Sequence, residues 1–274
     1  MSEPLVVAIM LTKDRSEMAA RAVRAFRKQT YDPTRRILSI LDTGAERHFV
    51  LDGSDSENEE HDWRPSVRGQ SIGALRNLAA SWAMPGSILI HWDDDDVSHP
   101  NRIAEQVAHL QSSGAEVVGY NKLLFWISLP KFVNHTVDGD EIGGPYADDL
   151  LGGEAWLYKA PHFTAPGTSL AYWRKTWEMK PFPDMPNNKQ STGEDVQWLK
   201  GMNLATVSSL AVKDWEMGKS DLLPRLIASI HGGNTMSYDL EGMIARGSRE
   251  WRRTPELDEF CRSRMRIWEK RRAF

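Results

Sequence analysis

Apolar runs alternate with amphipathic segments along the first part of the chain. Continuous apolar runs of strand length lie at residues 5–11, 36–41, 87–92 and 116–120. Between them, residues 14–31 and 71–83 place apolar side chains at helical spacing, and turn residues follow each segment. Strands that alternate with helices predict an α/β fold with a largely parallel, twisted sheet and right-handed crossovers.

Two local patterns add detail to this first part. Asp14, with Glu17 three positions later, has the spacing of an N-cap pair and predicts the start of the first helix. The stretch of residues 52–68 is polar and acidic, which predicts a solvated loop.

The pattern changes after Lys122, where glycine and proline clusters lie among aromatic residues. We therefore expect a second half of α+β type with many turns. Near the end, Thr254 and Pro255 are typical of a helix start, and an apolar face follows at Leu257, Phe260, Cys261, Met265 and Trp268. The other face of this helix is rich in arginine. It is either a solvated face or a docking surface for a membrane, a phosphate-rich acceptor or a partner.

The most informative feature is the run from Asp93 to Asp96, which directly follows the third apolar run. Alternate residues of a strand point the same way at a spacing of about 6.6 Å, so Asp93 and Asp95 can converge on one cation while Asp94 turns away. Ligands of open α/β sheets bind at the carboxyl ends of the strands, and oxygen ligands favour Mg²⁺ or Mn²⁺. The run therefore predicts a divalent metal site. Alternatively, Asp96 could cap the following helix, which would explain one aspartate of the four.

Composition narrows the class of protein. A net charge of −4 and a pI near 6.1 give no global reason to expect binding to nucleic acid or to anionic membranes. Cys261 is the only cysteine, so an intrachain disulfide is excluded and a buried apolar role is expected. Neither a signal-peptide pattern nor an apolar stretch of about 18 residues is found, so we expect a cytoplasmic protein, with peripheral membrane contact left open. Most of the eleven tryptophans are expected in the core, and a minority could stack on a sugar.

Several segments together match a known pattern. Residues 11–15 resemble the motif P-T-Y-N-R, residues 29–31 resemble Q-T-Y, residues 41–45 resemble V-D-D-G-S, and residues 73–79 resemble a helix with A-R-N-x-A. Residues 93–100 resemble D-A-D-D-x-x-x-P, which contains the DxD metal motif. Residues 167–170 resemble an acceptor-side turn, residues 193–199 resemble an E-D motif, and residues 231–235 resemble the motif H-x-x-N. The chain thus resembles a family 2 glycosyltransferase of the GT-A fold over most of residues 4–240. Thr43 and Lys13 depart from the pattern, where the family has Asp and Tyr.

The resemblance implies a domain plan. Residues 1–121 would form the nucleotide-sugar-binding half, and residues 122–240 the acceptor-binding half of the same GT-A domain. Residues 241–274 would add the basic amphipathic helix.

The resemblance also implies roles at the metal and the nucleotide. Asp95 would ligate the metal, Asp93 would contact it through water or contact the ribose, and Asp94 would belong to the nucleotide site. His231 would be a second protein ligand, although a histidine before two glycines is also typical of a structural loop residue. His91 is expected to be structural.

Thr12, Asp42 and Arg76 would hold the nucleotide. A carboxylate can accept the uracil N3–H, and a guanidinium can pair with phosphate as a fork. The alternatives are Asp42 as a turn former and Arg76 as a surface helix residue.

An acceptor hydroxyl needs a carboxylate that takes its proton, and Asp195 is the candidate base. Glu194 is the second candidate and could instead orient the acceptor or the base. Both acids also suit a helix N-terminus after Gly193, and the two roles are compatible. A single base opposite the leaving group implies inversion at the anomeric carbon.

The leading hypothesis is an inverting, Mn²⁺- or Mg²⁺-dependent transferase that uses a nucleotide-sugar donor, most readily a UDP-sugar, and a hydroxyl acceptor. Alternatives are a nucleotidyltransferase or a non-catalytic nucleotide-sugar-binding module of the same fold. The acceptor stays open among a glycan, a lipid, a protein and modified DNA.

Overall fold

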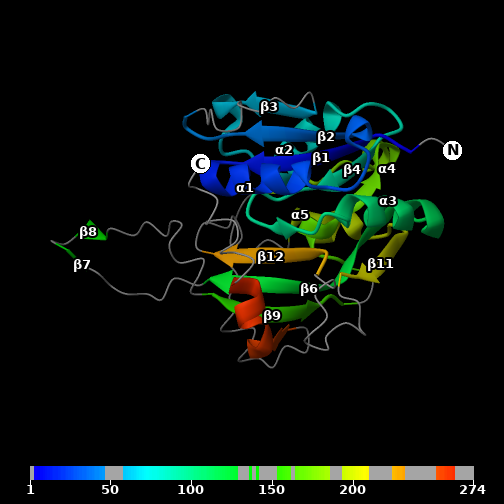
Figure 1. Ribbon diagram of the computed structural model, residues 1–274. Coiled ribbons are helices and arrows are strands. Elements are labelled where there is room, and N and C mark those ends of the chain that lie inside the picture. Colours follow the sequence, from blue (N-terminus) through cyan, green and yellow to red (C-terminus); the bar gives the residue numbers. More distant parts are fainter. Residues whose placement is uncertain are drawn as a thin grey trace.

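A mixed, mostly parallel β-sheet with helices on both faces forms the body of the protein (Figure 1). This computed structural model describes residues 3–46, 58–128, 136–137, 140–141, 153–161, 164–185, 193–209, 224–231 and 251–262. The α/β class predicted by the alternating pattern is confirmed.

The first half of the sheet is parallel. Strand β1 (Val6–Thr12) lies between β2 (Arg36–Asp42) and β4 (Ile88–His91), and β3 (Glu59–Trp63) pairs with β2 at the sheet edge. Parallel strands end at the same edge of a sheet. The residues that follow β1, β2 and β4 therefore lie together at the edge where α/β proteins bind ligands.

The second half is built around the long strand β6 (Val117–Ser128), which the short antiparallel strand β10 (Ala171–Trp173) connects to β4. Strands β11 (Leu204–Ser208) and β12 (Leu226–His231) pair with β6 in parallel. Strand β9 (Glu154–Lys159) pairs with β6 in antiparallel fashion, and β13 (Trp251–Arg253) pairs with β9 in the same way. Strand β12 also pairs with β5 (Val97–Ser98), which begins directly after the aspartate run. Strands β7 (Thr136–Val137) and β8 (Asp140–Glu141) form a separate pair. The expected domain boundary at residues 121 and 122 falls inside β6, and the division into halves stays a prediction.

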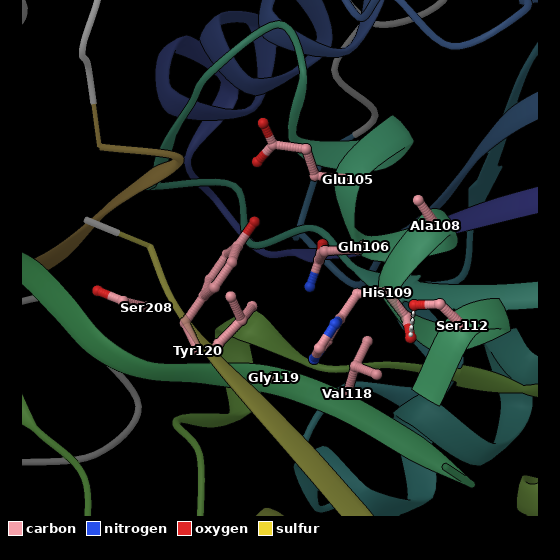
Figure 2. A pocket seen from close by; sticks show the side chains of 10 residues that line it. Glu105, Gln106, Ala108, His109, Ser112, Val118, Gly119, Tyr120 and Ser208 are labelled. Carbon is pink, nitrogen blue, oxygen red and sulfur yellow. Dashed lines mark hydrogen bonds between the residues drawn. The ribbon is translucent and has the colours of Figure 1, made fainter. Parts of the chain in front are cut away.

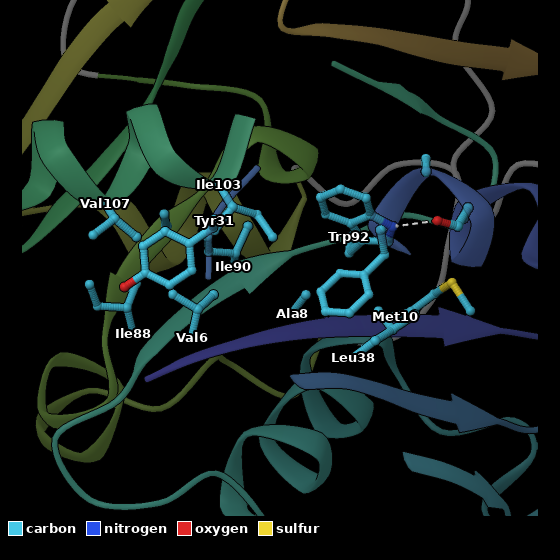
Figure 3. Packing of buried hydrophobic residues seen from close by; sticks show 14 of the residues in the cluster. Val6, Ala8, Met10, Tyr31, Leu38, Ile88, Ile90, Trp92, Ile103 and Val107 are labelled. Atoms are coloured by element: carbon cyan, nitrogen blue, oxygen red, sulfur yellow. Dashed lines mark hydrogen bonds between the residues drawn. The ribbon is translucent and has the colours of Figure 1, made fainter. Parts of the chain in front are cut away.

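Helices α1 (Ser16–Arg27) and α3 (Arg102–Ser113) pack on one face of the sheet, and α2 (Ile72–Ser81) and α5 (Glu194–Leu199) pack on the other. The alternation of β1 explains the two cores, because Val6, Ala8 and Met10 belong to the first and Val7 and Ile9 to the second. In the first core, shown in Figure 3, buried Trp92 donates its indole N–H to the carbonyl of Ala22 at 3.1 Å. The remaining short elements are α4 (Arg174–Met179) and 3₁₀ turns at Pro33–Arg35, Pro65–Val67, Gly167–Ser169 and Pro255–Leu257.

Two local predictions were wrong. Residues 59–63 form β3 within the stretch that was expected to be a loop; residues 52–57 lie outside the described residues. An edge strand leaves one side in solvent and so tolerates charge, and Glu59 is held by Arg27 at 2.7 Å. Asp14 does not cap α1, because Arg15 occupies the cap position. Asp14 has a φ of 54°, and its carboxylate instead accepts from the Ala45 N–H at 2.7 Å, which ties together the turns after β1 and β2.

The last described segment partly matches the expected amphipathic helix. A 3₁₀ turn at Pro255–Leu257 leads into helical residues 258–262. Leu257 and Cys261 are buried in a cluster with Trp126, which confirms the buried role of the cysteine. Met265, Trp268 and the basic positions beyond residue 262 lie outside the described residues. Within the described ranges, no helix combines the length and the apolar character that crossing a membrane requires.

Candidate functional site

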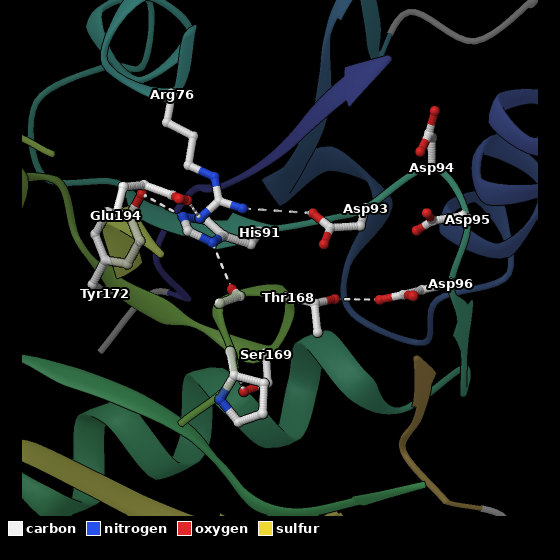
Figure 4. A network of polar contacts seen from close by, with 12 residues as sticks. Arg76, His91, Asp93, Asp94, Asp95, Asp96, Thr168, Ser169, Tyr172 and Glu194 are labelled. Atoms are coloured by element: carbon white, nitrogen blue, oxygen red, sulfur yellow. Dashed lines mark hydrogen bonds and ion pairs between the residues drawn. The ribbon is translucent and has the colours of Figure 1, made fainter. Parts of the chain in front are cut away.

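The aspartate run forms a turn at the end of β4, and its side chains spread in different directions (Figure 4). Asp94 points away from its neighbours, as predicted, although the run is a turn and not a continuation of the strand. Its carboxylate accepts from the hydroxyl of Thr12 at 2.7 Å and pairs with Arg15 at 3.0 Å. Thr12 is the last residue of β1, so this contact joins two adjacent strand ends.

The other three aspartates come together. Asp93, Asp95 and Asp96 each offer a carboxylate oxygen, and these oxygens lie within 4.8 Å of one another. An all-oxygen donor set of this kind fits Mg²⁺ or Mn²⁺. The pairing of Asp93 with Asp95 follows the sequence prediction, whereas Asp96 is an addition.

Asp96 does not cap the following helix, so that alternative was wrong. Helix α3 begins at Arg102, after Asn101. The carboxylate of Asp96 instead accepts from the backbone N–H of Ser229 at 3.0 Å and from the hydroxyl of Thr168. It therefore connects the aspartate turn to β12 and to the 3₁₀ turn at residues 167–169.

Arg76 connects the aspartate turn to the second pair of acids. It lies on α2, is 8% exposed, and its guanidinium is 2.8 Å from Glu194 and 4.0 Å from Asp93 (Figure 4). Asn77 fixes the helix here, because its side chain exchanges two hydrogen bonds with the backbone of Phe182 at 2.8 and 2.9 Å. Arg76 is thus a buried bridge between two acidic groups, not a surface helix residue.

Asp195 lies beside Glu194 in the first turn of α5, where the positive end of the helix favours acids. Its carboxylate accepts from the Val196 N–H at 2.9 Å and packs against Gly167. A Cβ atom on Gly167 would lie 2.5 Å from Oδ2 of Asp195, closer than real contacts allow. Glycine at this position therefore lets the 167–169 turn approach the carboxylate.

The same turn is anchored by His91 (Figure 4). This buried histidine donates from Nδ1 to the carbonyl of Gly167 at 2.6 Å, so its Nε2 accepts from the hydroxyl of Tyr172 at 3.2 Å. Burial, with help from the charge of Arg76, lowers the pKa of His91 well below its usual value and keeps the ring neutral. The structure thus gives His91 the structural role that was expected from the sequence.

The acids of the site are harder to ionise than free carboxylic acids. Burial raises the pKa of Asp94 to about 7, and repulsion from Asp95 adds to this shift. Burial raises the pKa of Asp195 to about 6, and repulsion from Glu194 adds to that shift. The pKa of Asp93 is raised, first by burial, and that of Asp96 is raised well above its ordinary value by burial and by its aspartate neighbours. A concentration of carboxylates with raised pKa values favours a cation in their midst.

Thr12 and Asp42, two of the residues expected to hold the nucleotide, lie at adjacent strand ends. Asp42, at the end of β2, is fully buried; it accepts from the Gly44 N–H at 2.8 Å and lies 3.4 Å from Nε2 of His61. The next residue, Thr43, donates its backbone N–H to the backbone carbonyl of Thr12 at 3.0 Å. These contacts give Asp42 a turn-forming role, one of the two alternatives that the sequence left open.

His231 is the last residue of β12, two positions after the Ser229 that bonds Asp96. Its side chain lies outside the described residues, so its role as a metal ligand stays a prediction.

A cavity of about 440 Å³ lies elsewhere, between α3, β6 and β11 (Figure 2). Its lining includes Glu105, His109, Tyr120 and Val207, and none of the candidate acids. Its position therefore keeps it separate from the site described above.

Solved structures of similar architecture include glycosyltransferases. S. aureus TarS 1–349 in complex with UDP-GlcNAc matches with a TM-score of 0.53 and 14% identity, over 85% of this chain and 61% of that one. The mannosyltransferase PcManGT from Pyrobaculum calidifontis, in complex with GDP-Man and Mn²⁺, matches with a TM-score of 0.52 and 12% identity, over 97% of this chain and 70% of that one. This chain has a GT-A-like fold.

These likenesses establish the fold alone, because the identities are low. A further structure of TarS 1–349 matches at a TM-score of 0.50 with 15% identity over 74% of this chain. In both comparisons the matched part covers about three fifths of the length of TarS 1–349. No family model matches the sequence, and no curated protein is similar to it at a significant level.

Sequence reasoning named Arg76 but missed two further cations of the site, Arg15 and Arg21, and the hydroxyl of Thr168. Arg15 contacts Asp94 and Asp95, Arg21 donates to the main-chain carbonyl of Asp95 at 2.8 Å, and Thr168 contacts Asp96. The rule that buried carboxylates need counter-charges predicts that such cations exist. Their identities depend on which turns meet at the sheet edge, which one sequence does not reveal.

Proposed function

We propose that this protein is a glycosyltransferase that moves a sugar from a nucleotide-sugar donor to a hydroxyl acceptor. One observation carries the proposal: carboxylates suited to a divalent ion are connected, through Arg76, to a second acidic pair beside a close-packed turn. Glycosyl transfer needs both groups, one at the leaving diphosphate and one at the acceptor. The GT-A-like fold supports the proposal.

Asp93 and Asp95, joined by Asp96, would hold the divalent ion, either Mn²⁺ or Mg²⁺. When bound there, the ion would supply Lewis-acid neutralisation of the charge that develops on the leaving diphosphate. Mn²⁺ in the PcManGT complex supports this choice. His231 is proposed as a further ligand from the motif resemblance.

Asp195 is proposed as the base that takes the proton of the acceptor hydroxyl. Its pKa of about 6 suits this role, because a base is most effective when its pKa is near the working pH. Glu194 is paired with Arg76, so we assign it an orienting role. A single base that deprotonates the acceptor opposite the leaving group gives inversion.

The nucleotide is proposed to lie across the ends of β1, β2 and β4, near Thr12, Asp42, Asp94 and Arg76. A UDP-sugar is the first candidate donor, from the motif resemblance and from the TarS complex with UDP-GlcNAc. A GDP-sugar is the next candidate, because PcManGT binds GDP-Man.

Thermal unfolding of the purified protein tests the donor site. UDP or GDP at about 100 times its dissociation constant adds roughly 2.7 kcal/mol of stability. That should raise the melting temperature by about 5 °C or more in a domain of this size. We expect a shift with UDP that requires Mn²⁺ or Mg²⁺ and disappears with a chelator. Incubation with UDP-sugars should then release UDP. A folded sample that responds to neither nucleotide would contradict the proposal.

A further inference from the structure

Arg15 already occupies part of the proposed metal site. It directly precedes α1, and its guanidinium spans two neighbouring aspartates. Nη2 lies 3.0 Å from Oδ1 of Asp94, and Nη1 lies 3.1 Å from Oδ2 of Asp95. Asp95 is also one of the three carboxylates that converge within 4.8 Å. The protein's own cation therefore binds a group that the metal would need.

The environment holds this pair together. The side chain of Arg15 is 17% exposed, and those of Asp94 and Asp95 are 2% and 8% exposed. Low exposure limits screening by water, so the attraction between the guanidinium and the carboxylates is stronger than at the surface. Thr12 holds the far oxygen of Asp94, which fixes that carboxylate toward Arg15.

A second cation on the same carboxylate is opposed in two ways. The guanidinium and the incoming ion repel each other, and they compete for the charge of the Asp95 oxygens. Both effects weaken the binding of a free ion. An ion that arrives with a diphosphate is opposed less, because the phosphates supply anionic ligands and reduce the net positive charge of the complex.

We propose that Arg15 is a built-in counter-cation that lowers the affinity of Asp93, Asp95 and Asp96 for a free divalent ion. The inference rests on the proposed function, because it assumes that the ion binds these three carboxylates. Its consequence is selectivity: the site favours a metal–nucleotide complex over the free metal. Arg15 acts here as a positioning residue through its charge on Asp95.

Titration with Mn²⁺ alone tests the inference, with the free ion followed by its electron paramagnetic resonance signal. Arg15→Gln and Arg15→Met remove the charge and keep most of the stem, and both should bind Mn²⁺ about tenfold more tightly than the wild type. Arg15→Lys keeps the charge and should bind as weakly as the wild type. Circular dichroism and thermal unfolding verify that each variant is folded.

Arg68→Gln is the matched control. Arg68 pairs with Asp14 at 2.7 Å on the neighbouring turn, so its loss changes the net charge equally without touching the aspartate run. Its Mn²⁺ affinity should equal that of the wild type. Unchanged or weaker binding in Arg15→Gln and Arg15→Met would overturn the inference.

Asp95→Asn separates failure of the inference from failure of the proposed function. In the Arg15→Gln background it should abolish the tight binding. If Asp95→Asn abolishes Mn²⁺ binding but the Arg15 variants bind like the wild type, the metal site stands and the inference falls. If Mn²⁺ binds none of these proteins, or binds regardless of Asp95, both fall.

Discussion

The two acidic groups of the site are held in different ways. The aspartate run follows a buried strand, and residues of other elements contact its last three members. The carboxylate of Asp94 contacts Arg15 and Thr12, and that of Asp96 accepts from the Ser229 N–H. Asp95 contacts Arg15 through its carboxylate and Arg21 through its backbone carbonyl. The pair of Glu194 and Asp195 instead begins the short helix α5, where Arg76 pairs with Glu194 and Asp195 accepts from the Val196 N–H and packs against Gly167.

This difference suits the two proposed tasks. Carboxylates that receive a divalent ion must be fixed in place, and several contacts fix them. A base must accept a proton near neutral pH, and strong pairing with a guanidinium would lower its pKa too far. Burial, and then the charge of Glu194, raise the pKa of Asp195 to about 6, while Arg76, which lowers this pKa, is paired with Glu194 and not with Asp195. The contrast yields variants that should affect one group and spare the other.

The largest expected effect separates the two groups directly. Asp195→Asn removes the proposed base and should lower kcat by about 10²- to 10⁴-fold, the range typical of general base catalysis. Donor binding, measured as the thermal shift with UDP and Mn²⁺, should be retained. Asp95→Asn should lose both transfer and the metal-dependent shift. Normal turnover in either variant, or loss of the donor shift in Asp195→Asn, would overturn the division of roles.

A smaller effect is expected when Asp195 is displaced but kept. In Gly167→Ala, the new Cβ would lie 2.5 Å from Oδ2 and 3.0 Å from Cγ of Asp195, so the carboxylate or the turn must move. A displacement of about 1 Å can lower a rate by about 10²-fold, and we expect a loss of this order in kcat.

A double-mutant cycle is the control for Gly167→Ala. If the substitution acts through Asp195, adding it to Asp195→Asn should produce little further loss. Additive losses would show that Gly167 matters for another reason, such as its carbonyl contact with His91.

The sequence predicted the parts of the fold that depend on local pattern. The runs that became β1, β2 and β4 are continuous and apolar because helices cover both faces of these strands. The divergence of Asp94 from Asp93 and Asp95 agrees with the prediction from strand alternation, although the run forms a turn after β4, and the convergence of Asp96 with Asp93 and Asp95 does not follow that alternation. The apolar runs are recognised without knowledge of distant residues.

The features that were missed depend on contacts between distant segments. Strand β3 is polar because it lies at the sheet edge, and only its pairing with β2 makes it a strand. Asp96 belongs to the carboxylate cluster, and the hydroxyl that donates to it comes from Thr168, 72 residues later in the chain. Asp14 is not the cap of α1, and its carboxylate accepts from Ala45 in the turn after β2. Spacing along the chain contains no signal for such contacts.

The smallest expected effect concerns pH and tests why the two groups differ. Burial and the charge of Glu194 raise the pKa of Asp195 to about 6, and a base acts only when deprotonated. The kcat should therefore fall about tenfold per pH unit below this value and level off above it.

Glu194→Gln tests whether Asp195 is the group that controls the fall of kcat at low pH, the acid limb of the profile. It removes the neighbouring charge and frees Arg76 to act on Asp195, and both changes lower the pKa of Asp195. The acid limb of kcat should move to lower pH, while the profile of an exposed control such as Glu178→Gln, on α4, should match the wild type. A limb that stays in place in Glu194→Gln would mean that another group, such as Asp94 with its pKa of about 7, controls the profile. The aspartate run, and not the acidic pair on α5, would then set the working pH.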